Sequence, residues 1–138
     1  MAADLNPSGL SKRVGSTGEM LARAVQRARD ELRDEPLVQA RMLMTLGAAY
    51  KELERLDDAR PLLEESAAIR RRELGADHPD YAMSISFLGD VHGLEGDLDA
   101  ARKLHEEALA IRRAVLGEGH QAAQRARVAL LQPGQGQI

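Results

Sequence analysis

The chain has 138 residues, a formal net charge of −3 and no cysteine, and 43% of its residues are hydrophobic. This length suits one domain with a continuous core. The lack of cysteine excludes disulfides, thiolate nucleophiles and cysteine-ligated zinc. The slight negative charge argues against a dedicated nucleic-acid-binding protein, which usually carries a basic field. The only aromatic residues are Tyr50, Tyr81 and Phe87, so we expect a core of aliphatic side chains, which suits close-packed helices.

The beginning of the chain predicts a tail followed by a helix. Residues 1–15 show no periodicity and are predicted to form a flexible tail. Ser16 and Glu19 match a capping box, and apolar residues then recur at helical spacing to about Leu32. No segment has the apolar length of a signal peptide or a membrane span, so we expect a cytoplasmic protein without membrane contact. The excess of arginine over lysine is typical of GC-rich bacterial genomes.

The central feature of the sequence is a repeat with a period of 42 residues. Several short motifs recur at this distance without a gap: Leu46-Gly47 as Leu88-Gly89, Ile69-Arg70-Arg71 as Ile111-Arg112-Arg113, Leu74-Gly75 as Leu116-Gly117, and His78 as His120. A fixed period of this size indicates stacked supersecondary units, each of which buries its apolar face on the next.

Within each unit the periodicity predicts two antiparallel helices joined by a short turn. Gly75 and Gly117 are predicted to end the second helix of each pair. Gly47 and Gly89 are predicted to face Ala59 and Ala101, so that the two helices approach closely. The fold class is therefore all-α, with about six helices. The predicted segments are a tail (1–15), a half repeat (16–33), two repeats (37–75 and 79–117), a capping helix (120–131) and a second flexible tail (132–138).

The patterns Leu46-Gly47-x-x-Tyr50 and Ala59-x-x-x-Leu63 resemble the tetratricopeptide repeat (TPR) family. The 42-residue period, with Ala-Ile-Arg-Arg followed by Leu-Gly-x-x-His, looks like the variety typified by kinesin light chain. The resemblance covers about residues 18–131. It implies a right-handed superhelical solenoid that binds a protein or peptide on its concave face, without a cofactor.

On this resemblance, the concave face is lined by the first helix of each pair. Kinesin-light-chain-type repeats carry two asparagines where this chain has Met44-Thr45 and Ser86-Phe87. The chain therefore favours a partner with apolar anchors over clamping of a peptide backbone. The predicted partner-binding residues are Arg41, Met44, Thr45, Ala48, Lys51, Glu52, Met83, Ser86, Phe87, Asp90 and Leu94.

The residues themselves do not indicate catalysis. The sequence has no nucleophile–base set and no glycine-rich phosphate loop, so we expect a non-catalytic protein–protein interaction module. One alternative is a self-association or regulatory segment of a larger bacterial signalling protein, because the segment from Leu32 to Tyr50 also looks like the TPR regions of bacterial serine/threonine kinases. In that case an apolar flank on the terminal helices would favour homo-oligomers.

Histidine supplies a second alternative, of another class. His92 and His105 replace Tyr50 and Leu63 of the preceding repeat on adjacent helices, so they could meet and hold a metal together with Asp90 or Glu106. The competing interpretation is a polar pair that binds backbone or water. His78 and His120, at predicted helix starts, are interpreted as caps.

The arginines of the repeat also allow two interpretations. Arg70, Arg71 and Arg72, with Arg112-Arg113, could form a basic stripe for phosphates. Glutamates lie one or two turns away at helical spacing, which favours a solvated, salt-bridged outer face.

Overall fold

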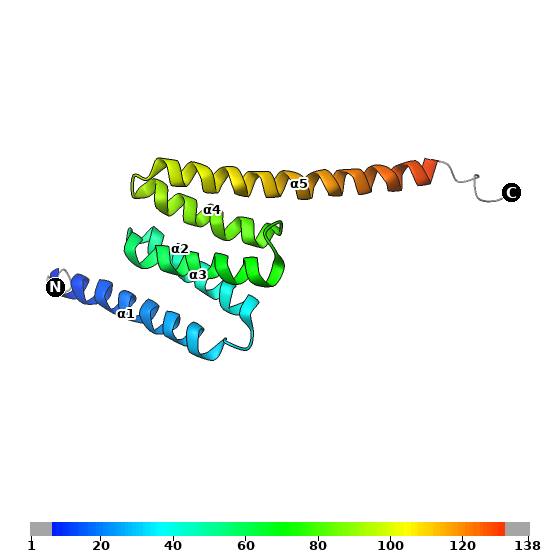
Figure 1. Ribbon diagram of the computed structural model, residues 1–138. Helices are drawn as coiled ribbons and strands as arrows, with labels where there is room; N and C mark the ends of the chain where they lie inside the picture. The colour runs from blue at the N-terminus through cyan, green and yellow to red at the C-terminus, as the bar shows by residue number, and fades with distance from the viewer. Residues whose placement is uncertain (1–6, 132–138) are drawn as a thin grey trace, which may run out of the picture.

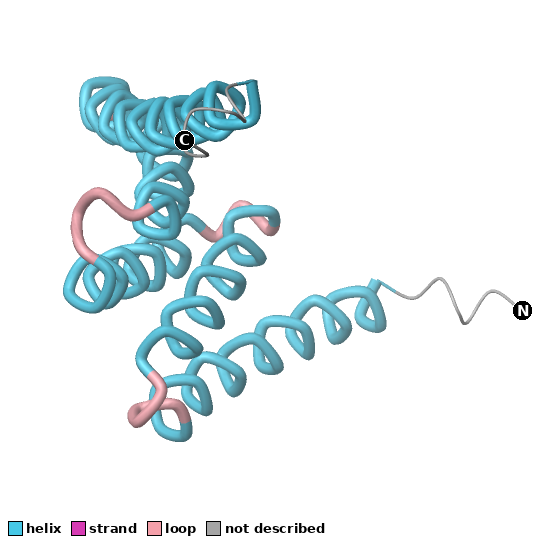
Figure 2. The backbone as a smooth tube through the Cα atoms, turned by 90° about the vertical axis from the view of Figure 1, so that its right-hand side faces the viewer, coloured by secondary structure: helices cyan, strands magenta, loops and turns pink. Residues whose placement is uncertain are grey.

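The structure of the protein is a computed structural model that describes residues 7–131, with side chains from Ser16 onward. Five helices and no strand form within this part of the chain, and short loops join them in sequence (Figure 1, Figure 2). The predicted all-α solenoid of antiparallel helix pairs is confirmed. The helices are α1 (Pro7–Glu31), α2 (Pro36–Glu52), α3 (Leu56–Leu74), α4 (Pro79–Leu94) and α5 (Leu98–Leu131).

Local signals explain where α2 and α4 begin and where α3 ends. Pro36 and Pro79 occupy the first turns of α2 and α4, where a missing N–H costs nothing and the fixed φ suits a helix. Gly75 ends α3 with a φ of 94°, a conformation that only glycine adopts freely. His78 is extended, and its Nδ1 accepts a hydrogen bond from the backbone N–H of Asp80 at 3.0 Å. The predicted capping role of His78 is therefore confirmed.

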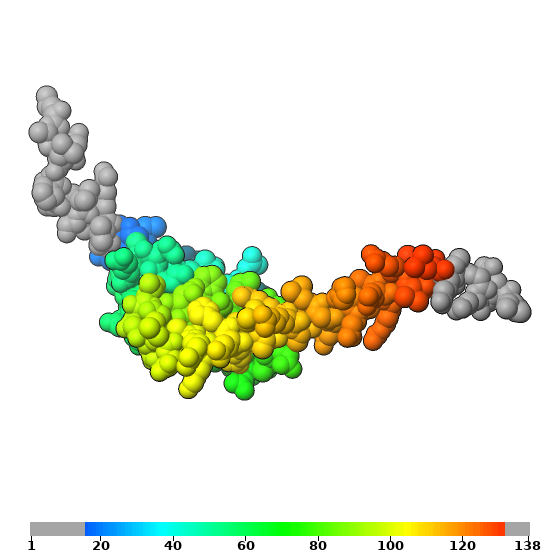
Figure 3. Space-filling view, turned by 90° about the horizontal axis from the view of Figure 1, so that it is seen from above, coloured from blue at the N-terminus to red at the C-terminus, as the bar shows by residue number. Residues whose placement is uncertain are grey.

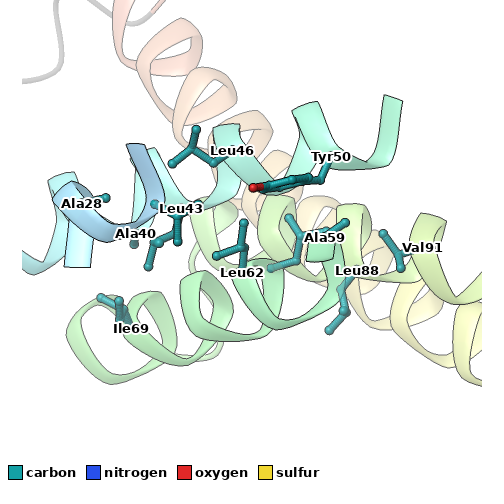
Figure 4. Packing of buried hydrophobic residues seen from close by; sticks show 12 residues of the cluster. Ala28, Ala40, Leu43, Leu46, Tyr50, Ala59, Leu62, Ile69, Leu88 and Val91 are labelled. Atoms are coloured by element: carbon teal, nitrogen blue, oxygen red, sulfur yellow. The ribbon is translucent and has the colours of Figure 1, made fainter. Parts of the chain in front are cut away.

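The main core lies between α1, α2, α3 and the second half of α4. Leu43 and Leu63 are almost completely buried there, and Tyr50, Ala59 and Val91 belong to the same cluster. Figure 4 shows how Leu43, Tyr50, Ala59 and Val91 are spread along this core. A smaller cluster joins the first half of α4 to α3 and α5 through Ala67, Tyr81, Ala82, Ile85, Ala108 and Ile111. Burying one Leu or Ile side chain stabilises the folded state by about 1.5–3 kcal/mol, because its apolar surface is removed from water. The two clusters make the repeats one continuous stack.

Polar contacts attach α1 to the first full repeat. Arg29 makes a two-pronged ion pair with Glu65 of α3, at 2.8 and 3.2 Å. The side-chain amide of Gln39 donates to the carbonyls of Ala28 and Arg29, at the end of α1, where helix carbonyls run short of backbone donors. Val25 and Ala28 are buried beside these contacts. These contacts pack the last turns of α1 against α2 and α3.

The start of α1 differs from the prediction. The tail expected over residues 1–15 is helical from Pro7 onward, and residues 1–6 lie outside the described part. Ser16 and Glu19 are inside the helix, so they do not form the expected capping box. The physical reason is that Pro7 is itself well placed at a first helical position, and the capping-box motif does not exclude an earlier start.

The end of the second repeat differs more strongly. Gly117 does not end a helix, and the predicted capping helix over 120–131 is the continuation of α5, which runs unbroken from Leu98 to Leu131. His120 is consequently not a cap. The sequence difference that explains this lies one residue further on: Pro79, which follows the first repeat, corresponds to Gln121, which follows the second. Proline pushes the preceding residue out of the helical region, whereas glutamine lets the helix continue.

The close approach of the paired helices agrees with the prediction at Gly47 and differs from it at Gly89. A Cβ added to Gly47 would lie 2.9 Å from Cγ of Leu63, and one added to Gly89 would lie 2.9 Å from Nε2 of His105. The carbonyl oxygen of Ala59, one of the predicted partners, lies 3.4 Å from the Cβ added to Gly47, whereas Ala101 lies beside Gly93. Each glycine also faces the residue sixteen positions later, which is an apolar core residue in one repeat and a half-exposed histidine in the other.

We therefore expect opposite effects when these two glycines are replaced by alanine. Gly47→Ala should lower the free energy of unfolding by about 1–3 kcal/mol, because the fully buried Leu63 has no room to move. Gly89→Ala should change it little or raise it by up to about 1 kcal/mol, because the ring of His105 can swing outward and alanine favours the helix. Urea denaturation of both variants measures the difference, and equal losses would contradict the account.

Candidate partner-binding face

Three of the predicted face residues meet between α2 and α4. The ammonium of Lys51 lies 5.1 Å from the ring centre of Phe87 and 3.6 Å from a carboxylate oxygen of Asp90. The other oxygen of Asp90 lies 3.3 Å from Nε2 of His105 on α5. The side chain of Lys51 is only 15% exposed, so its charge is held against the ring, where cation–π attraction is strongest. We call Lys51, Phe87, Asp90 and His105 the charged cluster.

Helix geometry explains why these residues meet. Phe87 and Asp90 lie three positions apart on α4 and therefore share a face. The ring of Phe87 packs against the main core, and the ammonium of Lys51 on α2 lies over the same ring. Asp90 sits next to Gly89, and His105 covers that glycine. The small residue at position 89 is thus what lets the imidazole come within reach of the carboxylate.

A second polar group lies beneath the same face and is buried. Ser66 donates to the carbonyl oxygen of Ala40 at 2.7 Å and shares a hydrogen bond of 2.9 Å with Ser84. Arg70 donates from Nη1 to the hydroxyl of Ser84 and to the carbonyl of Asp80, both at 3.0 Å. Ser66, Arg70 and Ser84 form what we call the buried polar network, which links α2, α3 and α4.

The position of Arg70 corrects the sequence analysis, which placed it on a solvated outer face. Arg70 is only 5% exposed, and burial lowers the pKa of its guanidinium, an effect that the nearby Asp80 opposes. Its Nη1 also contacts the sulfur of Met44 at 3.1 Å. Arg71 and Arg72 do remain exposed, so the stripe of adjacent arginines is divided between the interior and the surface.

The buried polar network escaped sequence reasoning, although the repeat contains a signal for it. The 42-residue counterparts of Ser66, Met44 and Asp80 are Ala108, Ser86 and Ala122, so the partners of Arg70 change together in the second copy. Arg112, the counterpart of Arg70, is exposed. The positions at which the two copies differ therefore indicate that Arg70 is buried and Arg112 is exposed.

The remaining predicted face residues lie around these two groups. Arg41, Thr45, Glu52, Met83 and Leu94 are exposed, and Ala48 and Ser86 are partly covered. Thr45 donates a hydrogen bond to the carbonyl of Arg41 within its own helix. Met83 and Leu94 expose 40% and 63% of their surface on the helix that carries Phe87. The structure thus brings together apolar and charged side chains on α2 and α4.

The alternative of a metal site at His92 and His105 needs at least three ligands close together. His105 pairs with Asp90, and His92 acts electrostatically on Glu95, whose pKa is lowered first by a hydrogen bond from Arg60 and less by His92. Within the part of the chain that the structure describes, no group of three or more histidine, aspartate or glutamate side chains could hold a metal ion. Among the described residues, no hydrogen bond joins His92 to His105.

Stacked antiparallel helix pairs with a repeated close-packing glycine define a helical-repeat protein of the solenoid class. The sequence profile of the tetratricopeptide repeat family matches residues 38–114, which is more than half of the 138 residues. The chain therefore belongs to the tetratricopeptide repeat family. A search of curated proteins finds no match to the chain. Among the described residues, no helix is long and apolar enough to cross a membrane.

Proposed function

We propose that the chain is a non-catalytic interaction module that binds a peptide or helical segment of a protein partner on the face formed by α2 and α4. Tetratricopeptide repeats generally mediate protein–protein interaction, and the family is typically non-catalytic. The observation that carries the proposal is the charged cluster at the α2–α4 seam, where Phe87 is held between Lys51 and the core. A bacterial and cytoplasmic setting, and a place in a larger signalling protein, stay predictions from the sequence.

The chemistry of this face favours a partner with an apolar anchor next to an acidic group. Phe87 and Met83 supply an apolar surface with one flexible thioether, which adapts to different side chains. Lys51 is already neutralised by Asp90 and lies near Glu52. The structure shows no ion pair for Arg41 among the described residues, so Arg41 is the cation available to an incoming carboxylate.

Panning of a random peptide library against the protein tests this proposal. We expect a consensus with an apolar residue and a nearby acidic residue. Arg41→Glu combined with Met83→Ala should weaken binding of that peptide by about tenfold or more, because a charge contact and an anchor are lost together. Phe87 is avoided in this variant because its ring also packs on the core.

A matched control removes the same kinds of group from another surface. Arg102→Glu combined with Leu98→Ala also reverses one arginine and shortens one exposed apolar side chain, at the start of α5. This control should bind the selected peptide as the unaltered protein does. Equal loss in both variants, or no loss in either, would contradict binding on the α2–α4 face.

A further inference from the structure

The last part of α5 stands away from the rest of the molecule. Every residue from Arg112 to Leu131 is exposed, and this stretch projects past the other helices (Figure 1, Figure 3). We call its final residues, 121–131, the α5 arm. No other described helix packs on the arm, so only the continuity of the backbone keeps it in line with the rest of α5.

Helix α5 also carries an apolar face that lacks the cover found in the first repeat. Ala67 of α3 is buried in the smaller core cluster with the first half of α4, and Leu74 is partly buried. Their counterparts 42 residues later, Leu109 and Leu116, expose 46% and 72% of their surface. These two leucines lie seven residues apart, so they share one side of α5. That side is distinct from the one that α4 covers, where Ala108 is buried.

The packing of α4 on α3 shows which side of a following helix faces inward. One residue of α4 lies in the smaller core cluster with Ala67, one shares a hydrogen bond with Ser66 and one lies in the main core: these are Tyr81, Ser84 and Leu88. Their counterparts in the α5 arm are Ala123, Ala126 and Leu130. All three are apolar, so the arm has the inward side that is needed to cover α5 as α4 covers α3.

The side of α4 that faces its hairpin partner α5 is matched by a more polar side of the arm. Gly89 lies on this side of α4 against His105, together with Ala82 and Ile85. The counterparts in the arm are Gln124, Arg127 and Leu131. The first two suit contact with water, and a leucine in place of the glycine prevents close approach of a further helix. The arm therefore has the pattern of a last helix, with a polar outer side.

The link before the arm repeats the turn that separates α3 from α4. In that turn Gly75 ends α3 with a φ of 94°, and His78 caps α4 through its Nδ1. Gly117 and His120 stand at the same places in the link, with Gly119 between them. Glycine weakens a helix and adopts positive φ without strain. The link therefore suits a turn as well as a helix.

We propose that residues 117–120 are a hinge, at which the α5 arm folds back and packs antiparallel on Leu109 and Leu116 of the same chain. In this closed form the arm lies on α5 as α4 lies on α3. In the open form, which the structure shows, the arm continues the helix. The hinge concerns α5 alone, so the inference does not depend on the function proposed for the α2–α4 face.

Opposing contributions keep both forms accessible. Closing removes two exposed leucines from water, which favours the closed form. Gln121 stands where the first turn has Pro79, whose ring disfavours the helical conformation at the residue before it, so the open helix is permitted. Ala126 stands where Ser84 accepts a hydrogen bond from Arg70, so the closed form lacks this bond. The arm therefore covers or exposes the apolar end of the stack.

Distances between two spin labels test the hinge. The chain has no cysteine, so Lys103→Cys combined with Arg127→Cys supplies two labelling sites, both at exposed positions. In the continuous helix these positions lie about 36 Å apart at the helical rise per residue. In the closed form they lie about 20 Å apart or less, because the axes of packed helices are about 8–10 Å apart. We expect electron paramagnetic resonance of the full chain, diluted with unlabelled protein, to show both distances, and the long distance alone would overturn the proposal.

Two variants of the labelled protein define the ends of the equilibrium. Gln121→Pro should show mainly the short distance, because proline favours the turn that precedes α4. Gly117→Ala combined with Gly119→Ala should show only the long distance, because alanine favours the helix. If Gln121→Pro keeps the long distance alone, or if the alanine variant keeps the short distance unchanged, the proposed hinge is wrong.

A matched pair of substitutions tests which side of the arm packs inward. Ala126→Glu places a charge on the inward side and should lower the population of the short distance by about tenfold or more. Gln124→Glu adds the same charge on the outer side and should leave that population unchanged. Both residues are exposed in the open form. Equal populations in the two variants would contradict packing of the arm on Leu109 and Leu116.

Discussion

We expect Arg70→Ala to lower the free energy of unfolding by about 3 kcal/mol or more. The guanidinium of Arg70 is buried and donates to the hydroxyl of Ser84 and the carbonyl of Asp80. Removing it deletes two hydrogen bonds from a charged donor and opens a cavity between α3 and α4. Hydrogen bonds of a charged group contribute about 1.5–3 kcal/mol, and the cavity adds to that. The loss should therefore exceed that of an ordinary surface substitution several-fold.

The repeat provides the control for this prediction. Arg112 occupies the same position 42 residues later but is exposed, so Arg112→Ala should change the free energy of unfolding by no more than about 0.5 kcal/mol. Urea denaturation followed by circular dichroism measures both values. If the two variants lose the same stability, Arg70 is not buried in a network that holds the first repeat to the second.

The second large effect is expected at Leu63, the residue on which Gly47 packs. Leu63 is 0% exposed and lies against Gly47 of α2. Leu63→Ala should lower the free energy of unfolding by about 2–5 kcal/mol, because the removed methyl groups lose their burial and the helices cannot close the space. The same measurement as for Arg70 detects this loss.

The counterpart of Leu63 in the second repeat is His105, which is only half-buried. His105→Ala removes a ring that lies against Gly89 and whose Nε2 is 3.3 Å from a carboxylate oxygen of Asp90. A partly exposed pair of this kind contributes about 0–1 kcal/mol, so we expect a loss of no more than about 1 kcal/mol. A larger loss at His105 than at Leu63 would show that the second hairpin, and not the first, is the more tightly packed.

Much of the fold could be predicted because the decisive signals are local. The 42-residue recurrence identifies stacked helix pairs, and the boundary between α3 and α4 follows from Gly75 and Pro79, which restrict the backbone directly. The burial of Leu43 and Tyr50 follows from helical periodicity alone. These features need no knowledge of which surfaces meet later in the stack.

The features that were missed depend on which neighbour covers a helix. Arg70 and Arg112 sit in the same local motif, but only Arg70 lies under a following helix, so the sequence around each one cannot separate them. Gly117 repeats Gly75, yet the residue that decides whether the helix stops is Gln121 in place of Pro79. The meeting of Lys51, Phe87 and Asp90 was predicted only as a shared face, because their side-chain contacts depend on the spacing between α2 and α4.

The most direct test of the proposed binding face is a nuclear magnetic resonance titration of the protein with a peptide selected from the library. The account predicts that the amide and side-chain signals of Thr45, Met83 and Phe87 shift most, together with those of their neighbours on α2 and α4. Signals from the exposed residues Arg71 and Arg72 of α3 and from residues 112–131 of α5 should stay in place. Shifts centred on either of those regions, with Phe87 unaffected, would contradict a partner-binding role for the α2–α4 face.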